Sequence, residues 1–592
     1  ARVNSGLFPR NIHDTLARVG GGMIRKSCAR IFILAIVVPM MWSTEGEAQG
    51  PDRSQGRSMV ISRQGIVAAE HPLAAQAGAT ILAQGGSAAD AAIAAHAVMG
   101  LVAPMSNGIG GDLFAIVYEA KTGKLYGLNA SGWSPTGFTL EFLKSQGHER
   151  MPSRGIHSVT VPGAVEGWAK LHQRFGRARL ADLLAPAIHY AEEGFPVTEL
   201  VAGLWGESEE ALGRGTNTAA VYLRNGKAPR TGEIFRNPDL AWTYRQIAQH
   251  GRDAFYGNEV AKRIVQVSES LGGKFTAADL AEFQAEWVEP ISTEYRGWKV
   301  YEIGPNVQGI AALVMLNILE NFPIGEYGHN TARTLHASIE AKKLAYADML
   351  RYVADPRFAT VPVEGMLSKP YALERAKLID PGKANCSVAA GAPPGAAGDT
   401  IYLSVVDRDG NMVSFIQSNY MSSGFASGIV PPGTGFVLQN RGALFTLEAG
   451  HPNAVAPRKR PLHTIIPAFM ERGDVRIAFG IMGGWNQAQA HAQFVMNIVD
   501  HGMDIQAAME AARFTKGTFE GCDLEMESRI PEDARKQLET LGHRIRLRGP
   551  FTRNVGGGQA AMRDFAAGVN YGASDPRKDG AAIPEPAPRK QP

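Results

Sequence analysis

The segment Gly391 to Tyr420, GAPPGAAGDTIYLSVVDRDGNMVSFIQSNY, decides the fold that we predict for this chain. Its beginning contains only Gly, Ala and Pro, a composition that is typical of a linker. At Thr400 it changes into a β-hairpin, whose two apolar runs (401–407 and 412–418) flank the turn signal Asp409-Gly410. Both runs carry apolar residues on both faces, so we expect the hairpin to lie in a sheet that is covered on both sides.

Thr400 lies where the linker meets the first strand, a position that suits a catalytic nucleophile. Cleavage of the peptide bond between Asp399 and Thr400 would give Thr400 a free α-amine beside its own hydroxyl. Because an α-amine has a reference pKa of about 8, it can accept the hydroxyl proton, and one residue then supplies both nucleophile and base. Taken alone, Asp-Thr at this place is also consistent with the ordinary start of a strand.

The expected hairpin register brings a second hydroxyl to this threonine. A two-residue loop at Asp409-Gly410 would place Thr400 opposite Asn419, with Ser418 as a close cross-strand neighbour. A loop of a different length would shift the pairing by one residue.

Several motifs in the chain resemble signatures of one enzyme family. GDTIYLSVVDRDGNMVSF at 398–415 resembles the start of the small subunit of the γ-glutamyltranspeptidase family. The other matching motifs are NGIGGD (107–112), VPGAVEGW (161–168), GTGFVLQNRG (433–442), APRKRPLHTIIP (456–467), MGG (482–484) and GASDPR (572–577). The resemblance extends from about Ile66 to Arg577, which is nearly the whole mature chain.

This resemblance implies an N-terminal-nucleophile hydrolase. Such an enzyme is an α+β protein with a four-layer αββα sandwich, made as one chain that cleaves itself before the threonine. We therefore expect a large subunit over residues 59–399 and a small subunit over 400–577, which together form a heterodimer. Residues 578–592 are Pro-rich and charged, and we predict that they form a disordered tail.

The N-terminal residues are typical of an exported protein. The first methionine is Met23, so we expect residues 1–22 to be a miscalled extension. Residues 23–48 combine a basic start, a short apolar run over 31–41 and small residues at 46–48, as in a secretory signal peptide. A membrane anchor is the alternative, although Pro39 and the shortness of the run disfavour it. We predict a periplasmic or secreted protein with no stable membrane span after signal removal.

Composition excludes several other functions. A net charge of +3 over 592 residues, without a basic stripe, argues against a nucleic-acid partner. The chain has no CxxC and no metal-ligand spacing, so we expect neither a metal nor a cofactor. After removal of the signal, Cys386 and Cys522 remain, and the sequence leaves open whether they pair. The Gly-rich loop 107–111 lacks the lysine-hydroxyl pair of a nucleotide-binding loop.

Periodicity and cap signals predict most of the regular structure. We expect helices over 73–83, 88–103, 331–352, 486–499 and 504–513, a hairpin from 114 to 128, a strand over 475–481 and late sheet over 559–571. Lys342-Lys343 in the longest helix is interpreted as a solvated face.

The expected acyl pocket departs from that of enzymes that bind γ-glutamyl groups. Those relatives pair an arginine with the substrate carboxylate, at a position that matches Ser131 here. They also hold the substrate ammonium with two acidic residues, at positions that match Arg441 and Leu444. A serine cannot make the bidentate contact of an arginine, and a site built for an ammonium rejects a cation. Arg441 would instead meet a carboxylate on another substrate, or pair with a neighbouring acid without touching a ligand.

Two further segments belong to the predicted site. Members of the family carry two adjacent hydroxyl residues at the pocket wall, at the positions of His463 and Thr464. Thr464 keeps its hydroxyl, whereas His463 does not and would either contact the substrate or serve in packing. Gly483 and Gly484 follow a strand and precede a helix, so their N–H groups can form an oxyanion hole. The family places its oxyanion hole here, although a diglycine by itself is more often a turn.

We therefore predict a γ-glutamyltranspeptidase-family enzyme. It would cleave a small-molecule amide through a Thr400 acyl-enzyme and pass the acyl group to water or an amine. Within the class, the alternative is a cephalosporin-acylase-like or oxamate-amidohydrolase-like amidase with weak γ-glutamyl activity. From a different class, the alternative is an uncleaved, secreted binding protein.

Overall fold

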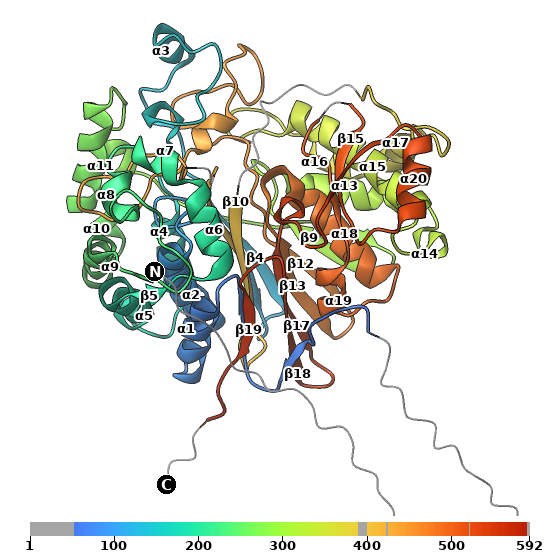
Figure 1. The fold of residues 1–592 in the computed structure, drawn as a ribbon, viewed down its shortest axis with the longest axis horizontal. Helices are drawn as coiled ribbons and strands as arrows, with labels where there is room; N and C mark the ends of the chain where they lie inside the picture. Colours follow the sequence, from blue (N-terminus) through green and yellow to red (C-terminus); the bar gives the residue numbers. More distant parts are fainter. Residues whose placement is uncertain (1–52, 389–398, 422–423, 520, 589–592) are drawn as a thin grey trace, which may run out of the picture. The chain divides into compact units, whose positions relative to one another are not determined.

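The computed structural model describes residues 53–388, 399–421, 424–519 and 521–588, with only the backbone of Asp399 and Thr400. These residues form one compact unit (Figure 1). The predicted extension (1–22), signal peptide (23–48) and Gly-Ala-Pro linker (391–398) lie outside the described residues. In the part that is described, no helix has the length and apolar character required to cross a bilayer.

Two seven-stranded sheets form the centre of the molecule. Sheet A consists, in spatial order, of β1 (Val60–Ser62), β18 (Val569–Ser574), β17 (Gly558–Asp564), β13 (Val475–Ile481), β12 (Ala468–Arg472), β9 (Trp298–Glu302) and β8 (Ile291–Tyr295). Sheet B consists of β19 (Ala581–Pro584), β2 (Ile66–Ala69), β10 (Asp399–Val406), β11 (Met412–Tyr420), β3 (Asp112–Glu119), β4 (Lys124–Ala130) and β7 (Glu286–Val288). All neighbours in both sheets are antiparallel. A pair β5 (Phe195–Pro196) and β6 (Ile234–Phe235) and a small sheet β14 (Phe514–Thr515), β15 (Asp523–Glu527) and β16 (Arg544–Arg548) complete the strands.

Helices cover the outer face of each sheet (Figure 1). Beside sheet B lie α1 (Pro72–Ala83), α2 (Ala88–Val102), α4 (Ala164–Phe175), α5 (Leu180–Glu193), α6 (Glu199–Glu207), α7 (Glu209–Gly213), α8 (Thr218–Tyr222), α9 (Pro238–His250), α10 (Arg252–Tyr256), α11 (Glu259–Ser270) and α12 (Ala277–Ala281). Beside sheet A lie α13 (Gly309–Leu319), α15 (Ala332–Tyr352), α16 (Val363–Leu367), α17 (Lys369–Ala376), α18 (Gln487–Val499) and α19 (Ile505–Glu510). The remaining helices are α3 (Leu140–Ser145), α14 (Ile324–Tyr327) and α20 (Glu532–Thr540).

The central hairpin β10–β11 is buried on both faces, as predicted. On β10, Ile401 and Leu403 belong to the core beneath α1 and α2, whereas Tyr402 and Val406 belong to the core between the sheets. This alternation produces a four-layer αββα sandwich, which is the predicted fold class.

Local signals account for the helices next to this hairpin. Ser87 accepts a hydrogen bond from Asp90 N, and the Asp90 carboxylate accepts one from Ser87 N, which makes the predicted capping box at the start of α2. All residues of α2 are buried, and its many alanines allow close packing against α1. The predicted helix 331–352 is confirmed as α15, with Thr331 as its N-cap.

Three local predictions are wrong. The hairpin loop is longer than two residues, because Val406 already pairs with Met412. Residues 581–584 of the predicted disordered tail form β19, which pairs with β2 at the edge of sheet B. Lys342 and Lys343, predicted to face solvent, are 1% and 3% exposed because α15 is covered on all sides.

The GASDPR motif has a structural role in a buried ion network. Arg577 donates from Nη2 to Glu527 Oε2 at 2.6 Å and from Nη1 to Asp575 Oδ1 at 3.0 Å. Arg513 donates from Nη2 to Asp575 Oδ2 at 2.5 Å. Glu527, Asp575 and Arg577 are almost completely buried. This network ties the last strands of sheet A to the small sheet that contains β15.

We expect Arg577→Ala to lower the free energy of unfolding by about 3–5 kcal/mol, because it removes the buried cation shared by two buried carboxylates. Chemical denaturation monitored by tryptophan fluorescence measures the change. Arg179→Ala is the matched control, since Arg179 pairs with Asp182 at the surface with 82% of its side chain exposed. Equal effects of the two substitutions would contradict the assigned importance of the network.

Candidate active site

Close packing between the two sheets positions β10 against β13. Ser404 Oγ on β10 donates to Ala478 O on β13 at 3.2 Å. Two residues away on each strand, a Cβ atom added to Gly480 would lie 2.4 Å from the Tyr402 ring, so only glycine fits there. The two strands therefore pass each other in opposite directions across the sandwich.

Continuing this alignment by two residues brings the start of β10 to the turn at 482–484. In this turn Gly483 and Gly484 have φ angles of +125° and +57°, which favour glycine. Among the described residues, neither glycine N–H donates a hydrogen bond. Both residues precede α18, at a helix start whose first N–H groups have no partner within the helix.

The observed hairpin register differs by one residue from the predicted one. Ile401 pairs with Gln417, and Asp399 pairs with Tyr420, with an irregularity between them. Thr400 therefore lies at the level of Ser418 and Asn419. The Ser418 side chain is fully buried and accepts a hydrogen bond from Tyr420 N at 2.8 Å. Ser418 remains the cross-strand neighbour that the sequence predicted.

Gln308 connects the diglycine turn to the segment that carries Thr464. Its Nε2 donates to Gly484 O at 2.8 Å and also to Thr464 O. Its backbone N donates to His463 O at 3.0 Å. Gln308 is completely buried, so it fixes these two parts of the site relative to each other. Sequence reasoning missed this residue, since a glutamine before a helix belongs to no motif.

Arg441 is a buried cation with spare hydrogen-bonding capacity. It begins the short helix η2 (Arg441–Leu444), donates from Nη1 to Thr464 Oγ1 at 2.6 Å and lies over the Tyr420 ring at 4.5 Å. Among the residues that the structure describes, its Nε and Nη2 have no hydrogen-bond partner. Burial lowers the pKa of Arg441 to about 10, and Asp112 opposes this change, so the group stays charged at neutral pH. Leu444, in contrast, is packed in the core between the sheets and sheet A helices.

Asp112 and His463 form a buried pair near this arginine. His463 Nε2 lies 2.9 Å from Asp112 Oδ2, and His463 Nδ1 accepts a hydrogen bond from Ile465 N at 3.3 Å. The imidazole therefore carries its proton on Nε2. Burial lowers the pKa of His463 well below its usual value. Burial also raises the pKa of Asp112 to about 7, against the opposing charge of Arg441. His463 thus orients a carboxylate and has no free nitrogen for a ligand.

Ser131 lies in a buried hydrogen-bonded cluster beside the Asp112–His463 pair. Its Oγ accepts a hydrogen bond from Asn306 Nδ2 at 3.3 Å, and its carbonyl accepts one from Arg460 Nε at 2.9 Å. Arg460 in turn pairs with Glu286 at 2.6 Å. Ser131 therefore adds no charge to the site, and the neighbouring guanidinium is engaged by protein groups.

A large open pocket borders the start of β10. It has a volume of about 950 Å³ and is lined by residues 147–154 together with Tyr420, Met421 and Ala443. Tyr420 pairs with Asp399 across the hairpin, and Arg441 lies over its ring.

In the part of the chain that the structure describes, one group of potential metal ligands lies away from this site, although the sequence predicted no metal. Ligand atoms of His336, Glu340 and His543 lie within 4.8 Å of one another. However, Lys343 Nζ donates a hydrogen bond to Glu340 Oε1 at 2.6 Å, and the two imidazoles hydrogen-bond to each other at 2.9 Å. The group therefore serves as a polar contact between α15 and the segment before β16.

Comparison with known proteins settles the family. The family model described as gamma-glutamyltranspeptidase matches residues 74–585. The chain belongs to this family. It is therefore an enzyme that acts on amide bonds as a hydrolase or acyltransferase, as the resemblance of its motifs implied.

Similar proteins within the family carry different names. The glutathione hydrolase-like YwrD proenzyme of Bacillus subtilis is 37% identical over 529 residues, covering 88% of this chain and 99% of the relative. The oxamate amidohydrolase proenzyme of Klebsiella pneumoniae is 35% identical over 532 residues, covering 88% and 98%. The crystal structure of a cephalosporin acylase from Bacillus halodurans is 43% identical, with a TM-score of 0.83 and coverage of 92% and 99%.

Proposed function

We propose that this protein cleaves itself between Asp399 and Thr400 and becomes an amidase of two subunits. The large subunit would contain residues 59–399, and the small subunit would begin at Thr400. Because β19 belongs to sheet B, the small subunit would extend beyond residue 577, to at least Pro584. The word proenzyme in the names of two relatives supports this processing.

The catalytic cycle follows from the arrangement around Thr400. Its hydroxyl attacks the substrate carbonyl carbon while the α-amine accepts the hydroxyl proton. The N–H groups of Gly483 and Gly484 stabilise the oxyanion of the tetrahedral intermediate, and Ser418 lies close enough in the register to hold the amine in place. The leaving amine departs with the proton. Water or an acceptor amine then attacks the acyl-enzyme ester and releases the acyl group.

Arg441 carries our proposal for the substrate class. This buried guanidinium has two nitrogens without a partner in the described part of the chain, and a carboxylate can accept two parallel hydrogen bonds from such a group. The acyl group would thus end in a carboxylate, as in a glutaryl amide or in oxamate. A γ-glutamyl group also has one, but its ammonium would lack the acidic pair that Arg441 and Leu444 replace. The γ-glutamyl activity is therefore expected to be weak.

Two relatives support this preference. One is named an oxamate amidohydrolase and another a cephalosporin acylase, while a third is named glutathione hydrolase-like. A substrate panel decides among them: initial rates on a γ-glutamyl anilide, a glutaryl anilide, oxamate and a neutral acyl anilide. We expect the carboxylate-bearing acyl groups without an ammonium to react fastest. Faster turnover of the γ-glutamyl anilide would overturn the assignment of Ser131, Arg441 and Leu444.

Processing is tested separately. A denaturing gel run with reductant should give two fragments, and sequencing of the smaller one should read Thr-Ile-Tyr-Leu-Ser. One intact band from purified protein with reductant would favour the uncleaved binding protein instead.

We also propose that residues 23–48 direct export, which makes the mature enzyme periplasmic or secreted. The basic start, short apolar run and small residues support a cleaved signal peptide. Fractionation of the producing cells, with N-terminal sequencing of the large subunit, tests this proposal. A large subunit that retains the apolar run would argue for a membrane anchor.

A further inference from the structure

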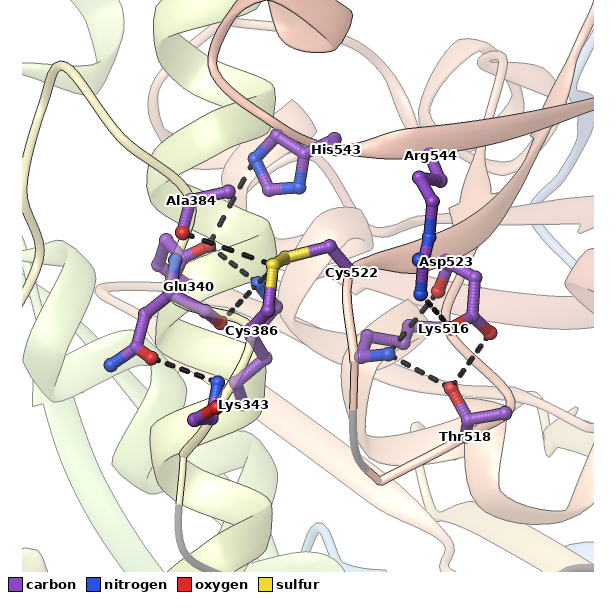
Figure 2. The surroundings of a disulfide bond; sticks show 12 residues. Glu340, Lys343, Ala384, Cys386, Lys516, Thr518, Cys522, Asp523, His543 and Arg544 are labelled. Carbon is purple, nitrogen blue, oxygen red and sulfur yellow. Dashed lines mark hydrogen bonds and ion pairs between the residues drawn. A yellow bond between two sulfur atoms is a disulfide. The ribbon is translucent and has the colours of Figure 1, made fainter.

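A disulfide joins two segments that lie on opposite sides of the proposed cleavage point (Figure 2). Cys386 follows α17 and precedes the Asp399–Thr400 bond, whereas Cys522 lies between β14 and β15. Their Cα atoms are 4.9 Å apart, although 136 positions separate them in the chain. The pairing that the sequence left open is therefore present.

Hydrogen bonds to backbone carbonyls also connect the segments around the disulfide. Gly521 N donates to Cys386 O at 3.1 Å, and Ala384 N donates to Leu541 O at 2.7 Å. Asn385 O accepts a hydrogen bond from Lys343 Nζ at 2.9 Å. The bond thus closes a well-packed contact.

The surrounding interface joins the same two parts of the chain. Ala332, Leu335 and Ile339 of α15 pack against a core from the small sheet and α20 that includes Phe514, Leu524 and Leu538. In addition, His336 of α15 and His543, which precedes β16, share a hydrogen bond of 2.9 Å. Residues before position 400 therefore meet residues after it along the whole contact.

We propose that the Cys386–Cys522 disulfide is a covalent link between the large and small subunits of the processed enzyme. The proposal rests on the cleavage that we assign to Asp399–Thr400. Once that bond is cut, no peptide bond connects the subunits, and this disulfide becomes their covalent connection. A disulfide is stable in the oxidising compartment that we propose for this protein.

The two sulfur atoms have different environments, so a reducing thiol should attack one of them in preference to the other. The Cys386 residue is exposed, whereas Cys522 is 1% exposed. Lys343 Nζ lies 3.7 Å from Cys522 Sγ, so its charge stabilises a thiolate at that atom. A small thiolate would attack Cys386 Sγ and displace Cys522 as the leaving thiolate. A second thiol then releases Cys386, which leaves two protein thiols and one small-molecule disulfide.

The link is tested on purified, active full-length protein whose free thiols are blocked with N-ethylmaleimide before denaturation. Without reductant, we expect one band that contains both subunits, and with dithiothreitol two bands. Mass spectrometry of the band obtained without reductant should recover a peptide pair joined through Cys386 and Cys522. Cys386→Ser, at the exposed residue, should give two bands even without reductant, and Cys522→Ser should do the same.

The outcomes separate this proposal from the proposed function. Two bands without reductant from the wild-type protein would overturn the link and leave the cleavage intact. One band with reductant would overturn the cleavage, and the link between subunits with it. A Thr400→Ala protein serves as the uncleaved control and should run as one band under both conditions.

Activity provides a second readout. We expect dithiothreitol to shorten the half-life of wild-type activity at elevated temperature several-fold, to the value of Cys386→Ser, because the processed subunits then separate more readily. The half-life of the Cys386→Ser enzyme should not respond to dithiothreitol. An equal response of both proteins would show that the reductant acts elsewhere and would count against the link.

Discussion

Thr400→Ala is expected to give a full-length protein without amidase activity. The substitution removes the hydroxyl that attacks both the Asp399–Thr400 peptide bond and the substrate, so processing and catalysis are lost together. Removal of a nucleophile from such a site lowers the rate by about 10⁴-fold or more. A denaturing gel with reductant measures processing, and initial rates on the preferred amide measure catalysis.

Two variants make this prediction specific. Thr400→Ser keeps a hydroxyl and an α-amine, and should retain part of both processing and hydrolysis. Ser404→Ala is the matched control on the same strand, because it removes a buried hydroxyl that bonds Tyr402 OH and Ala478 O across the sandwich. It should process normally. Two fragments from the Thr400→Ala protein would show that the nucleophile is another residue.

Arg441→Met should abolish the preference for carboxylate-bearing acyl groups. The substitution conserves volume but removes the charge-assisted bonds and leaves the substrate carboxylate buried and unpaired. We expect kcat/KM for a glutaryl amide or for oxamate to fall by about 100-fold, while the value for a neutral acyl amide changes little. The ratio of the two values is the measurement.

The neutral acyl amide is the internal control for structural damage, and Arg441→Lys is the conservative variant. A lysine keeps the charge but cannot make two parallel bonds, so we expect it to recover only part of the preference. Equal losses on all amides would mean that Arg441 only supports Thr464 and Tyr420.

Local chemistry explains why the start of the buried strand at Thr400 could be predicted while the register of the hairpin was not. The sequence change at Thr400, from Gly-Ala-Pro residues to two apolar runs, marks the start of a buried strand. The loop was misjudged because the Asp407 carboxylate accepts hydrogen bonds from Asp409 N and Asn411 N, at 3.0 and 2.9 Å. These bonds stabilise a wider loop than Asp409-Gly410 alone indicates.

The sequence identified only those residues of the candidate site that lie in local motifs. The diglycine, Thr464 and Arg441 lie in motifs, so their residue types could be identified. Gln308 and the pairing of Asp112 with His463 depend on side chains that are distant in the chain and meet across the two sheets. No periodicity within a strand or helix reports such contacts.

The sequence by itself determined the buried central hairpin and the family, because each depends on residue types at short spacing. Only the tertiary structure decided that the tail supplies an edge strand, that Lys342 and Lys343 are buried, and that Cys386 meets Cys522. Those outcomes depend on which distant segments cover a surface. Burial and pairing between segments more than a hundred residues apart are properties of the packed molecule.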